Sequence, residues 1–326
     1  MLARAVAWFV VGLLNLWAAA ALYIDVRFPG LHAPVTFLYV LGIVVVLTAL
    51  KRRALKAGLC LAAFCLVLAW WATLKPSNHG PWKPGADRTA WAQITGSRVT
   101  IHNLRHCEYR SEADFSDCWS DRTVDLAQLR ALDLFFVEWG LPFTGHAIAS
   151  FQFADQEHIA FSVEPRLKAA QSFSAVSSFF RQYQLIFVAG EERDVVRLRT
   201  SFRSHEEVFL FRTKIPPDEA RSLFLTYLEY LNRLHSRPEW YNALTRNCTT
   251  TMSRQIVGTT NDPPRWTSRF EPNTSFDKLL YNRGRLVTGN LPFEVLKRRE
   301  HINAAARAAN GSVTFSALIR AGRVGF

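Results

Sequence analysis

One cysteine in the C-terminal half has neighbours that favour a nucleophilic thiol. Cys248 lies in the run RNCTTTMSRQIVG, from Arg246 to Gly258. Asn247 is a good N-cap residue, apolar residues follow at helical spacing, and Gly258 is a typical stop, so the run predicts a helix that begins at Cys248. Free backbone N–H groups and the helix dipole at that position lower the pKa of a thiol and can hold an oxyanion. The alternative is a small side chain buried for packing.

A cysteine nucleophile needs a base, and His146 is the best placed of the nine histidines. The runs GHAIASFQF and HIAFSVEPR (145–153 and 158–166) predict the two strands of a β-hairpin. With a three-residue loop His146 lies directly opposite Glu164, whereas a two-residue loop breaks this pairing. Either Glu164 or His158 would orient the imidazole. The alternatives are a structural strand histidine and an ion pair between Glu164 and the arginine two positions on.

Three uncharged runs near the N-terminus are long enough to cross a bilayer, because 20 helical residues extend about 30 Å. The first run exceeds a signal-peptide core and lacks a small-residue cleavage site, so we expect it to remain. Four of the six residues Lys51–Lys56 are cationic, and short basic loops stay in the cytoplasm. The N-terminus is therefore expected in the cytoplasm and the chain after Leu74 outside, which is the periplasm of a two-membrane bacterium. The runs cover 5–24, 28–50 and 57–74.

The remaining cysteines leave Cys248 without an evident partner. Cys60 and Cys65 lie in the third apolar run, where a thiol behaves as a small hydrophobic group. Cys107 and Cys118 lie in a polar stretch on the exported side, where a disulfide between them is plausible. Cys248 is then the odd cysteine of an exported domain.

We expect a membrane domain at 1–74, a linker rich in Pro and Gly at 75–91, and an outer α+β domain at 92–326. Residues 216–238 place apolar side chains at helical spacing between prolines and predict a helix. The segment 124–139 suits either a helix or a strand, and the tail from Thr259 is expected to form loops and short helices. Further strands are predicted at 97–104, 184–190, 194–200 and 207–212.

The net charge argues for a membrane surface as partner. Of the formal charge of +12, +5 belongs to residues 1–74 and +7 to the remainder. A basic domain tethered to a membrane is attracted to anionic lipid headgroups, and the sequence contains no nucleic-acid-binding motif. His102, His106 and Cys107 lie close together, but no Cys-x-x-Cys accompanies them, so we expect no metal site and no cofactor.

Three long blocks carry a resemblance to a known family: GHAIASFQFADQEHIAFSVEPR, FFRQYQLIFVAGEERDVVRLRT and RPEWYNALTRNCTTTM. They resemble the periplasmic domain family named after the lipoprotein N-acylation protein Lnb, over roughly Trp82 to Ala317. That family resembles the circularly permuted papain-like fold of lecithin retinol acyltransferase and NlpC-type peptidases. In this group a strand histidine precedes an Asn-Cys pair at a helix N-terminus, and His146 followed by Asn247 and Cys248 matches that order.

The uncharged runs predict three N-terminal transmembrane helices, which depart from the family, where the arrangement of membrane segments varies. The resemblance implies that an α+β domain follows them: a papain-like, circularly permuted fold with an antiparallel sheet and a helix bearing the nucleophilic cysteine. Acyltransferases of this group carry a second histidine twelve residues after the first, where His158 stands, and Glu164 fits the same role. Typical members have a further charged run after SVE, where this chain has Pro165 and Ala169, so the resemblance does not carry substrate contacts over to that point.

The implied activity is a thiol acyltransferase of the bacterial inner membrane that N-acylates lipoproteins. Cys248 would take an ester-linked acyl chain from a diacylated lipoprotein or a phospholipid, and the thioester would pass it to the α-amino group of the lipoprotein's N-terminal cysteine. His146 would move the protons. The candidates for substrate contacts, each also able to serve a structural role, are Asn247, Arg166, Arg181 and Arg246.

Two other functions fit the same residues. A periplasmic cysteine amidase or other hydrolase would act on peptidoglycan peptides, although three membrane spans favour a lipid substrate. A membrane-tethered scaffold would use Cys248 only for packing. Alkylation near neutral pH separates a low-pKa nucleophile from a buried structural thiol.

Overall fold

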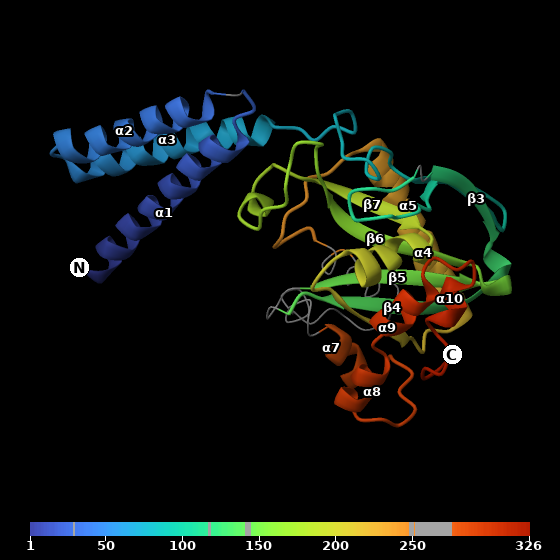
Figure 1. Ribbon diagram of the computed structural model, residues 1–326. Helices are drawn as coiled ribbons and strands as arrows, with labels where there is room; N and C mark the ends of the chain where they lie inside the picture. Colours follow the sequence, from blue (N-terminus) through green and yellow to red (C-terminus); the bar gives the residue numbers. More distant parts are fainter. Residues whose placement is uncertain (29, 117–118, 141–144, 248–250, 252–275) are drawn as a thin grey trace. The chain divides into compact units, whose positions relative to one another are not determined.

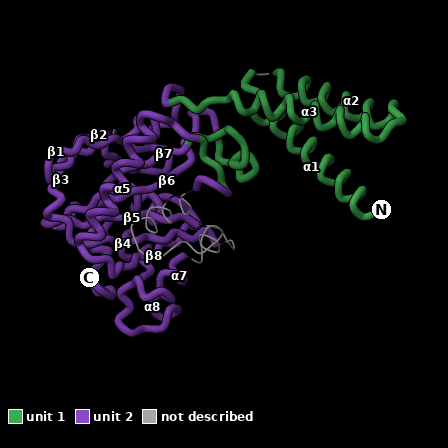
Figure 2. Tube along the Cα trace, turned by 180° about the vertical axis from the view of Figure 1, so that it is seen from behind, with its two compact units in different colours: residues 1–77, 172–184, 240–243 green, residues 78–171, 185–239, 244–326 purple. Residues whose placement is uncertain are grey.

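The computed structural model describes residues 1–326 except 29, 117–118, 141–144, 248–250 and 252–275 (Figure 1). The described chain divides into two compact units, shown in Figure 2. The first, the membrane unit, consists of residues 1–77, 172–184 and 240–243. The second, the outer unit, holds the other described residues between 78 and 326.

The membrane unit contains helices α1 (Leu2–Asp25), α2 (His32–Ala49) and α3 (Arg53–Thr73). All three are long and apolar enough to cross a membrane, as the uncharged runs predict. The loop between α2 and α3 does not include the whole basic stretch Lys51–Lys56, contrary to the prediction. The last four residues of the stretch already belong to α3, because the extended backbone at Leu50 and Arg52 is sufficient to reverse the chain.

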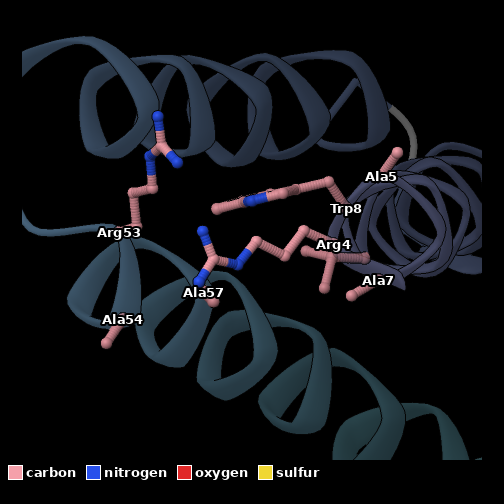
Figure 3. A pocket seen from close by; sticks show the side chains of 8 residues that line it. Arg4, Ala5, Ala7, Trp8, Arg53, Ala54 and Ala57 are labelled. Atoms are coloured by element: carbon pink, nitrogen blue, oxygen red, sulfur yellow. The ribbon is translucent and has the colours of Figure 1, made fainter. Parts of the chain in front are cut away.

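Helices α1 and α3 pack together through small side chains. Ala18 and Ala21 of α1 are fully buried, and small residues allow the close backbone approach that stabilises helix pairs in membranes. Near the N-terminal ends of α1 and α3 lies a pocket of ≈ 760 Å³. Figure 3 shows Arg4 and Trp8 extending from α1 and Arg53 from α3 toward this space.

The outer unit is built on a sheet that has eight strands among the described residues. Seven follow the spatial order β1-β2-β7-β6-β5-β4-β8, and β3 pairs with β2. The registered pairs are antiparallel, except that Arg105 of β2 and Gly190 of β7 pair in parallel. The strands are β1 (Trp91–Thr95), β2 (Arg98–Arg105), β3 (Trp119–Asp125), β4 (Leu129–Glu138), β5 (Gly145–Phe153), β6 (His158–Arg166), β7 (Gln184–Gly190) and β8 (Glu207–Arg212).

The β5–β6 hairpin is closed by a hydrogen bond from the backbone N–H of Phe153 to the carbonyl oxygen of Glu157 at 2.8 Å, which leaves the three-residue loop considered from the sequence. A 3-10 turn (Ala154–Gln156) joins the strands, and Gln156 adopts a left-handed φ of 63°, as the last residue of such loops commonly does. Ile148 pairs with Ser162, and continuing the register places His146 opposite Glu164. His146, Ser162 and Glu164 therefore share one face of the sheet.

Helix α5 (Pro217–Ser236) packs on the opposite face, where Phe151 of β5 contacts Phe224 and Tyr227 at ring-centroid distances of 5.0 and 5.4 Å. Its buried residues are the seven that the helical spacing predicts. The face that carries His146 is covered by α4 (Glu192–Val195), α9 (Asn303–Ala309) and α10 (Phe315–Leu318). The tail also contains α7 (Phe276–Asn282) and α8 (Phe293–Arg299), so it forms short helices as expected.

One predicted strand is wrong. Residues 194–200 form the end of α4 and a π-helical turn (Leu198–Phe202) rather than a strand. The successive residues Val195 and Val196 are both buried, and Asp194 is fully enclosed by hydrogen-bond donors, so the segment has no solvent-facing side. The segment 124–139, which suited either a helix or a strand, contains the end of β3, a 3-10 turn (Leu126–Gln128) and β4.

Candidate active site

His146 lies at the end of the sheet where β4 and β6 finish and β5 and β8 begin. It is the second residue of β5, pairs with Val137 of β4, and is 6% exposed. Glu164 is the third residue from the end of β6, and Glu206 directly precedes β8. The antiparallel pairing of these strands brings the three side chains to one end of the sheet.

The imidazole of His146 and the carboxylate of Glu164 are joined by the hydroxyl of Ser162. His146 Nε2 lies 2.7 Å from Ser162 Oγ, and Ser162 donates its hydroxyl hydrogen to Glu164 Oε1 at 2.8 Å. A serine hydroxyl carries one hydrogen, so Ser162 Oγ accepts the bond from His146. Nε2 therefore carries the proton of the neutral ring, and the lone pair that can act as a base is on Nδ1.

A buried arginine holds the carboxylate end of this relay. Arg199, in the π-helical turn, donates from Nη2 to Glu164 Oε1 at 3.0 Å and from Nη1 to Glu206 Oε2 at 3.1 Å. Trp139 donates its indole N–H to Glu206 Oε1 at 3.1 Å. One guanidinium thus binds two buried carboxylates, so the position of Glu164 is set by the segment that follows β7.

The surroundings keep the histidine neutral and the carboxyl ionised. Burial lowers the pKa of His146 well below its ordinary value of 6.5, and the positive charge of Arg199 lowers it further. For Glu164 burial acts to raise the pKa, but the guanidinium groups of Arg199, Arg203 and Arg105 more than offset this and hold the pKa well below its usual range. A neutral imidazole whose orientation is fixed by a serine hydroxyl, itself bonded to an ionised carboxylate, is suited to general-base chemistry.

His158 is not brought to His146. It pairs with Gln152 at the far end of the hairpin, six residues along β6 from Glu164, which is about 20 Å at the rise of a strand. Its Nδ1 lies 2.7 Å from the carbonyl oxygen of Gln156. Of the two residues considered as orienting groups, the structure joins Glu164 to His146 and leaves His158 at a remote position.

A second buried polar cluster on the same face fastens the C-terminal segment to the sheet. Arg320 donates to Asp133 Oδ2 at 2.7 Å and to Glu192 Oε1 at 2.6 Å. Ser150 also donates to Glu192 Oε1, at 2.6 Å. Like Ser162, Ser150 donates its hydroxyl to a buried carboxylate, but its partner Glu192 is bound by Arg320.

The arginines predicted to contact substrate have partners within the protein. Arg166 is 1% exposed, donates to the carbonyl oxygens of Ala86 and Asp87 at 2.6 and 2.8 Å, and lies over the ring of Trp82. The same contacts pack part of the expected linker onto the outer unit. The other two differ in setting. Arg181 donates to carbonyl oxygens at the end of α3, and Arg246 forms an ion pair with Glu239 at 3.2 Å.

The expected nucleophile Cys248 and the predicted helix that it begins lie outside the described residues, as does Cys118 of the possible disulfide. Asn247 is described, and its carbonyl oxygen accepts the backbone N–H of Thr251 at 3.0 Å, the spacing of an α-helical hydrogen bond. Cys107 is buried. In the described part of the chain, no three His, Cys, Asp or Glu side chains form a group that suits a metal ion.

The sequence analysis singled out none of Ser162, Arg199 and Glu206, which complete the hydrogen-bonded chain that begins at His146. The alternation in SVE, with Ser162 and Glu164 two residues apart, is the available signal for the relay. No local pattern marks Arg199, because it reaches Glu164 from 35 residues away through the tertiary fold.

Comparison with known proteins identifies a family model that matches part of the chain. The family model described as the Lnb N-terminal periplasmic domain matches residues 115–269. This range contains the β5–β6 hairpin, the π-helical turn and the Asn247–Cys248 pair. No curated protein and no solved structure matches the chain.

Proposed function

Residues 115–269 match the family model of the Lnb N-terminal periplasmic domain, and from that match we propose that the protein is a membrane-anchored thiol acyltransferase that N-acylates bacterial lipoproteins. Three membrane-capable helices precede the domain, which agrees with an inner-membrane protein. The proposed substrates, a lipoprotein and an acyl-chain donor, are anchored in the same membrane.

The first half-reaction transfers an acyl chain to the enzyme. His146 Nδ1 takes the proton of the Cys248 thiol, and the thiolate attacks the carbonyl carbon of a glyceryl ester. The carbon–oxygen ester bond breaks, the glyceryl oxygen takes the proton from Nδ1, and a thioester remains on Cys248. The expected helix N-terminus at Cys248 would supply backbone N–H groups for the oxyanion.

The second half-reaction transfers the chain to nitrogen. The α-amino group of the lipoprotein's N-terminal cysteine attacks the thioester carbon, and His146 Nδ1 accepts a proton from that amine. The carbon–sulfur bond breaks, the amide forms, and the proton returns to the sulfur of Cys248. The exchange of a thioester for an amide is favourable and requires neither ATP nor acyl-CoA.

The observation that supports this proposal is the relay from His146 through Ser162 to Glu164. It assigns the proton to Nε2 and leaves Nδ1 as the base, with a pKa lowered by burial so that the ring is neutral at physiological pH. Cysteine acyl transfer needs such a base for the thiol and again for the amine.

The test uses the full chain in detergent with a diacylated lipoprotein and inner-membrane phospholipids. We expect the wild type to produce an N-acylated N-terminal peptide, detected by mass spectrometry, and Cys248→Ala and His146→Gln to produce none. Cys65→Ala, a cysteine change in α3, is the matched control and should retain activity. A gain of one acyl chain identifies a phospholipid donor, and an unchanged total mass identifies transfer within the lipoprotein.

Failure of this test has a defined meaning. A wild-type protein that leaves the lipoprotein unmodified overturns the acyltransferase proposal. Release of free fatty acid or cleavage of peptidoglycan peptides that requires Cys248 would then establish a hydrolase. No activity and no alkylation of Cys248 near neutral pH would establish the scaffold.

A further inference from the structure

The segment 172–183, here called the anchored loop, belongs to the membrane unit although it connects two strands of the sheet. It follows β6, which carries Ser162 and Glu164, and leads directly into β7. Its sequence, SFSAVSSFFRQY, has one charged residue and four aromatic residues. Among the described residues, hydrogen bonds and ring contacts join it to the ends of the membrane-spanning helices and to other parts of the membrane unit.

Polar contacts attach the anchored loop to the C-terminal ends of α1 and α3. Asp25, the last residue of α1, is 1% exposed and accepts hydrogen bonds from Gln182 Nε2 at 2.8 Å and from the backbone N–H of Arg181 at 3.2 Å. Trp71 of α3 donates to the same carboxylate at 2.7 Å. The Arg181 guanidinium lies 3.9 Å from the centre of the Trp71 ring and donates to the carbonyl oxygen of Leu74.

An aromatic contact sets the depth of the anchored loop. Phe180 is 7% exposed and stacks on Trp17 of α1 with ring centroids 6.4 Å apart. Trp17 lies eight residues before the end of α1, about 12 Å along the helix axis. Phe180 is part of the same buried cluster as Ala21 and Val67, so it packs among side chains of the spanning helices. Phe180 therefore lies alongside the last turns of α1 and not beyond the end of the helix.

The residues next to this anchor are apolar and exposed. Phe173, Val176 and Phe179 are 52%, 62% and 42% exposed. The loop is ordered around them: the hydroxyl of Tyr183 accepts the backbone N–H of Ser174 at 2.8 Å and donates to the carbonyl oxygen of Ser172 at 2.9 Å. The loop that holds these three side chains contacts the ends of helices long and apolar enough to cross a membrane, and aromatic and apolar groups are favoured at a bilayer interface.

We propose that the anchored loop is embedded in the membrane leaflet on the side of the outer unit and contacts phospholipid through Phe173, Val176 and Phe179. The partner is the glycerophospholipid bilayer itself, and the apolar side chains displace water at the boundary between headgroups and acyl chains. Resting on the proposed function, the loop also contacts the lipid surface that holds the acyl donor.

The test places a photoreactive residue at each exposed position of the full-length protein in nanodiscs of phosphatidylethanolamine and phosphatidylglycerol. We expect Phe173→p-benzoylphenylalanine, Val176→p-benzoylphenylalanine and Phe179→p-benzoylphenylalanine to form lipid adducts on illumination, detected by mass spectrometry. Val313, which is 91% exposed on the outer unit, is the matched control and should form none. Absence of adducts at the three loop positions, or equal labelling at Val313, overturns the proposal.

A second measurement separates this proposal from the acyltransferase activity. In the variant with Phe173→Ser, Val176→Ser and Phe179→Ser, turnover of a bilayer-embedded substrate should fall about 10- to 100-fold, the cost of a misplaced reacting group. Turnover of a short-chain soluble ester should stay unchanged. Lipid adducts without any wild-type acyl transfer leave the membrane contact intact and refute only the proposed function. Equal losses on both substrates refute the role of the loop in reaching lipid.

Discussion

His146 Nε2 lies 2.7 Å from the Ser162 hydroxyl oxygen, so the imidazole reaches its carboxylate through a serine rather than directly. The diagonal contact between neighbouring strands is possible because the three-residue loop places His146 and Glu164 opposite each other. Its consequence is a defined tautomer, with the basic lone pair on Nδ1.

Replacing Ser162 should impair catalysis far more than it impairs folding. Ser162→Ala removes the acceptor that fixes the Nε2–H tautomer, and we expect kcat/KM for acyl transfer to fall about 100-fold. Ser150→Ala is the matched control, since it also removes a buried hydroxyl that donates to a carboxylate, at 2.6 Å, but from a serine that is bonded to no histidine. Equal kinetic losses in the two variants would contradict the relay.

The lowered pKa of His146 predicts a loss of stability in acid. The folded state binds this proton only below the ordinary histidine pKa of 6.5, whereas the unfolded chain binds it at about that pH. Stability from this residue is therefore complete above pH 6.5 and falls as the pH drops below it, by up to about 1.4 kcal/mol per pH unit. His146→Gln should show a shallower decline of the thermal midpoint between pH 6.5 and 5.

A decline that is identical in wild type and His146→Gln would show that this histidine titrates normally. His158 also has a pKa lowered by burial and accounts for part of the remaining slope. The double variant His146→Gln, His158→Gln should therefore be flatter than either single variant.

Removal of the Arg199 guanidinium should destabilise the outer unit strongly. Arg199→Met leaves Glu164 and Glu206 buried without their shared cation, and breaking a buried ion pair in this way costs about 3 to 5 kcal/mol. Thermal or denaturant unfolding in detergent measures the change. Arg110→Met removes an exposed ion pair with Asp114 and should leave the midpoint unchanged. Similar midpoints for the two variants would contradict the assigned role of Arg199.

The contacts of Arg166 predict a structural effect rather than a change in substrate affinity. Arg166→Met leaves the carbonyl oxygens of Ala86 and Asp87 without a donor and removes the cation from the ring of Trp82, so the thermal midpoint should fall. KM for the lipid substrate should stay within about twofold of wild type, since the guanidinium is enclosed by protein. A raised KM with an unchanged midpoint would instead support a lipid-phosphate contact.

Local sequence patterns were sufficient for the elements whose burial follows a simple period. Three uncharged runs predicted α1, α2 and α3, alternating residues with a short turn predicted β5 and β6, and the helical spacing predicted the buried face of α5. These predictions succeed because the side-chain periods of helices and strands are properties of the backbone. The same reasoning failed for residues 194–200, where tertiary burial on all sides removes the contrast between faces.

Part of the candidate site was predictable from the sequence, and part required the tertiary structure. The sequence by itself predicted the two strands that carry His146 and Glu164 and made their pairing depend on the length of the loop, and it singled out Cys248 as the expected nucleophile. Only the tertiary structure decided that Ser162 and not His158 bonds to His146, and that Arg199 fixes Glu164. A hydrogen bond between side chains distant in sequence requires the two atoms to be placed to within a few tenths of an ångström. Strand register and helix packing set these positions, and no local sequence pattern encodes them.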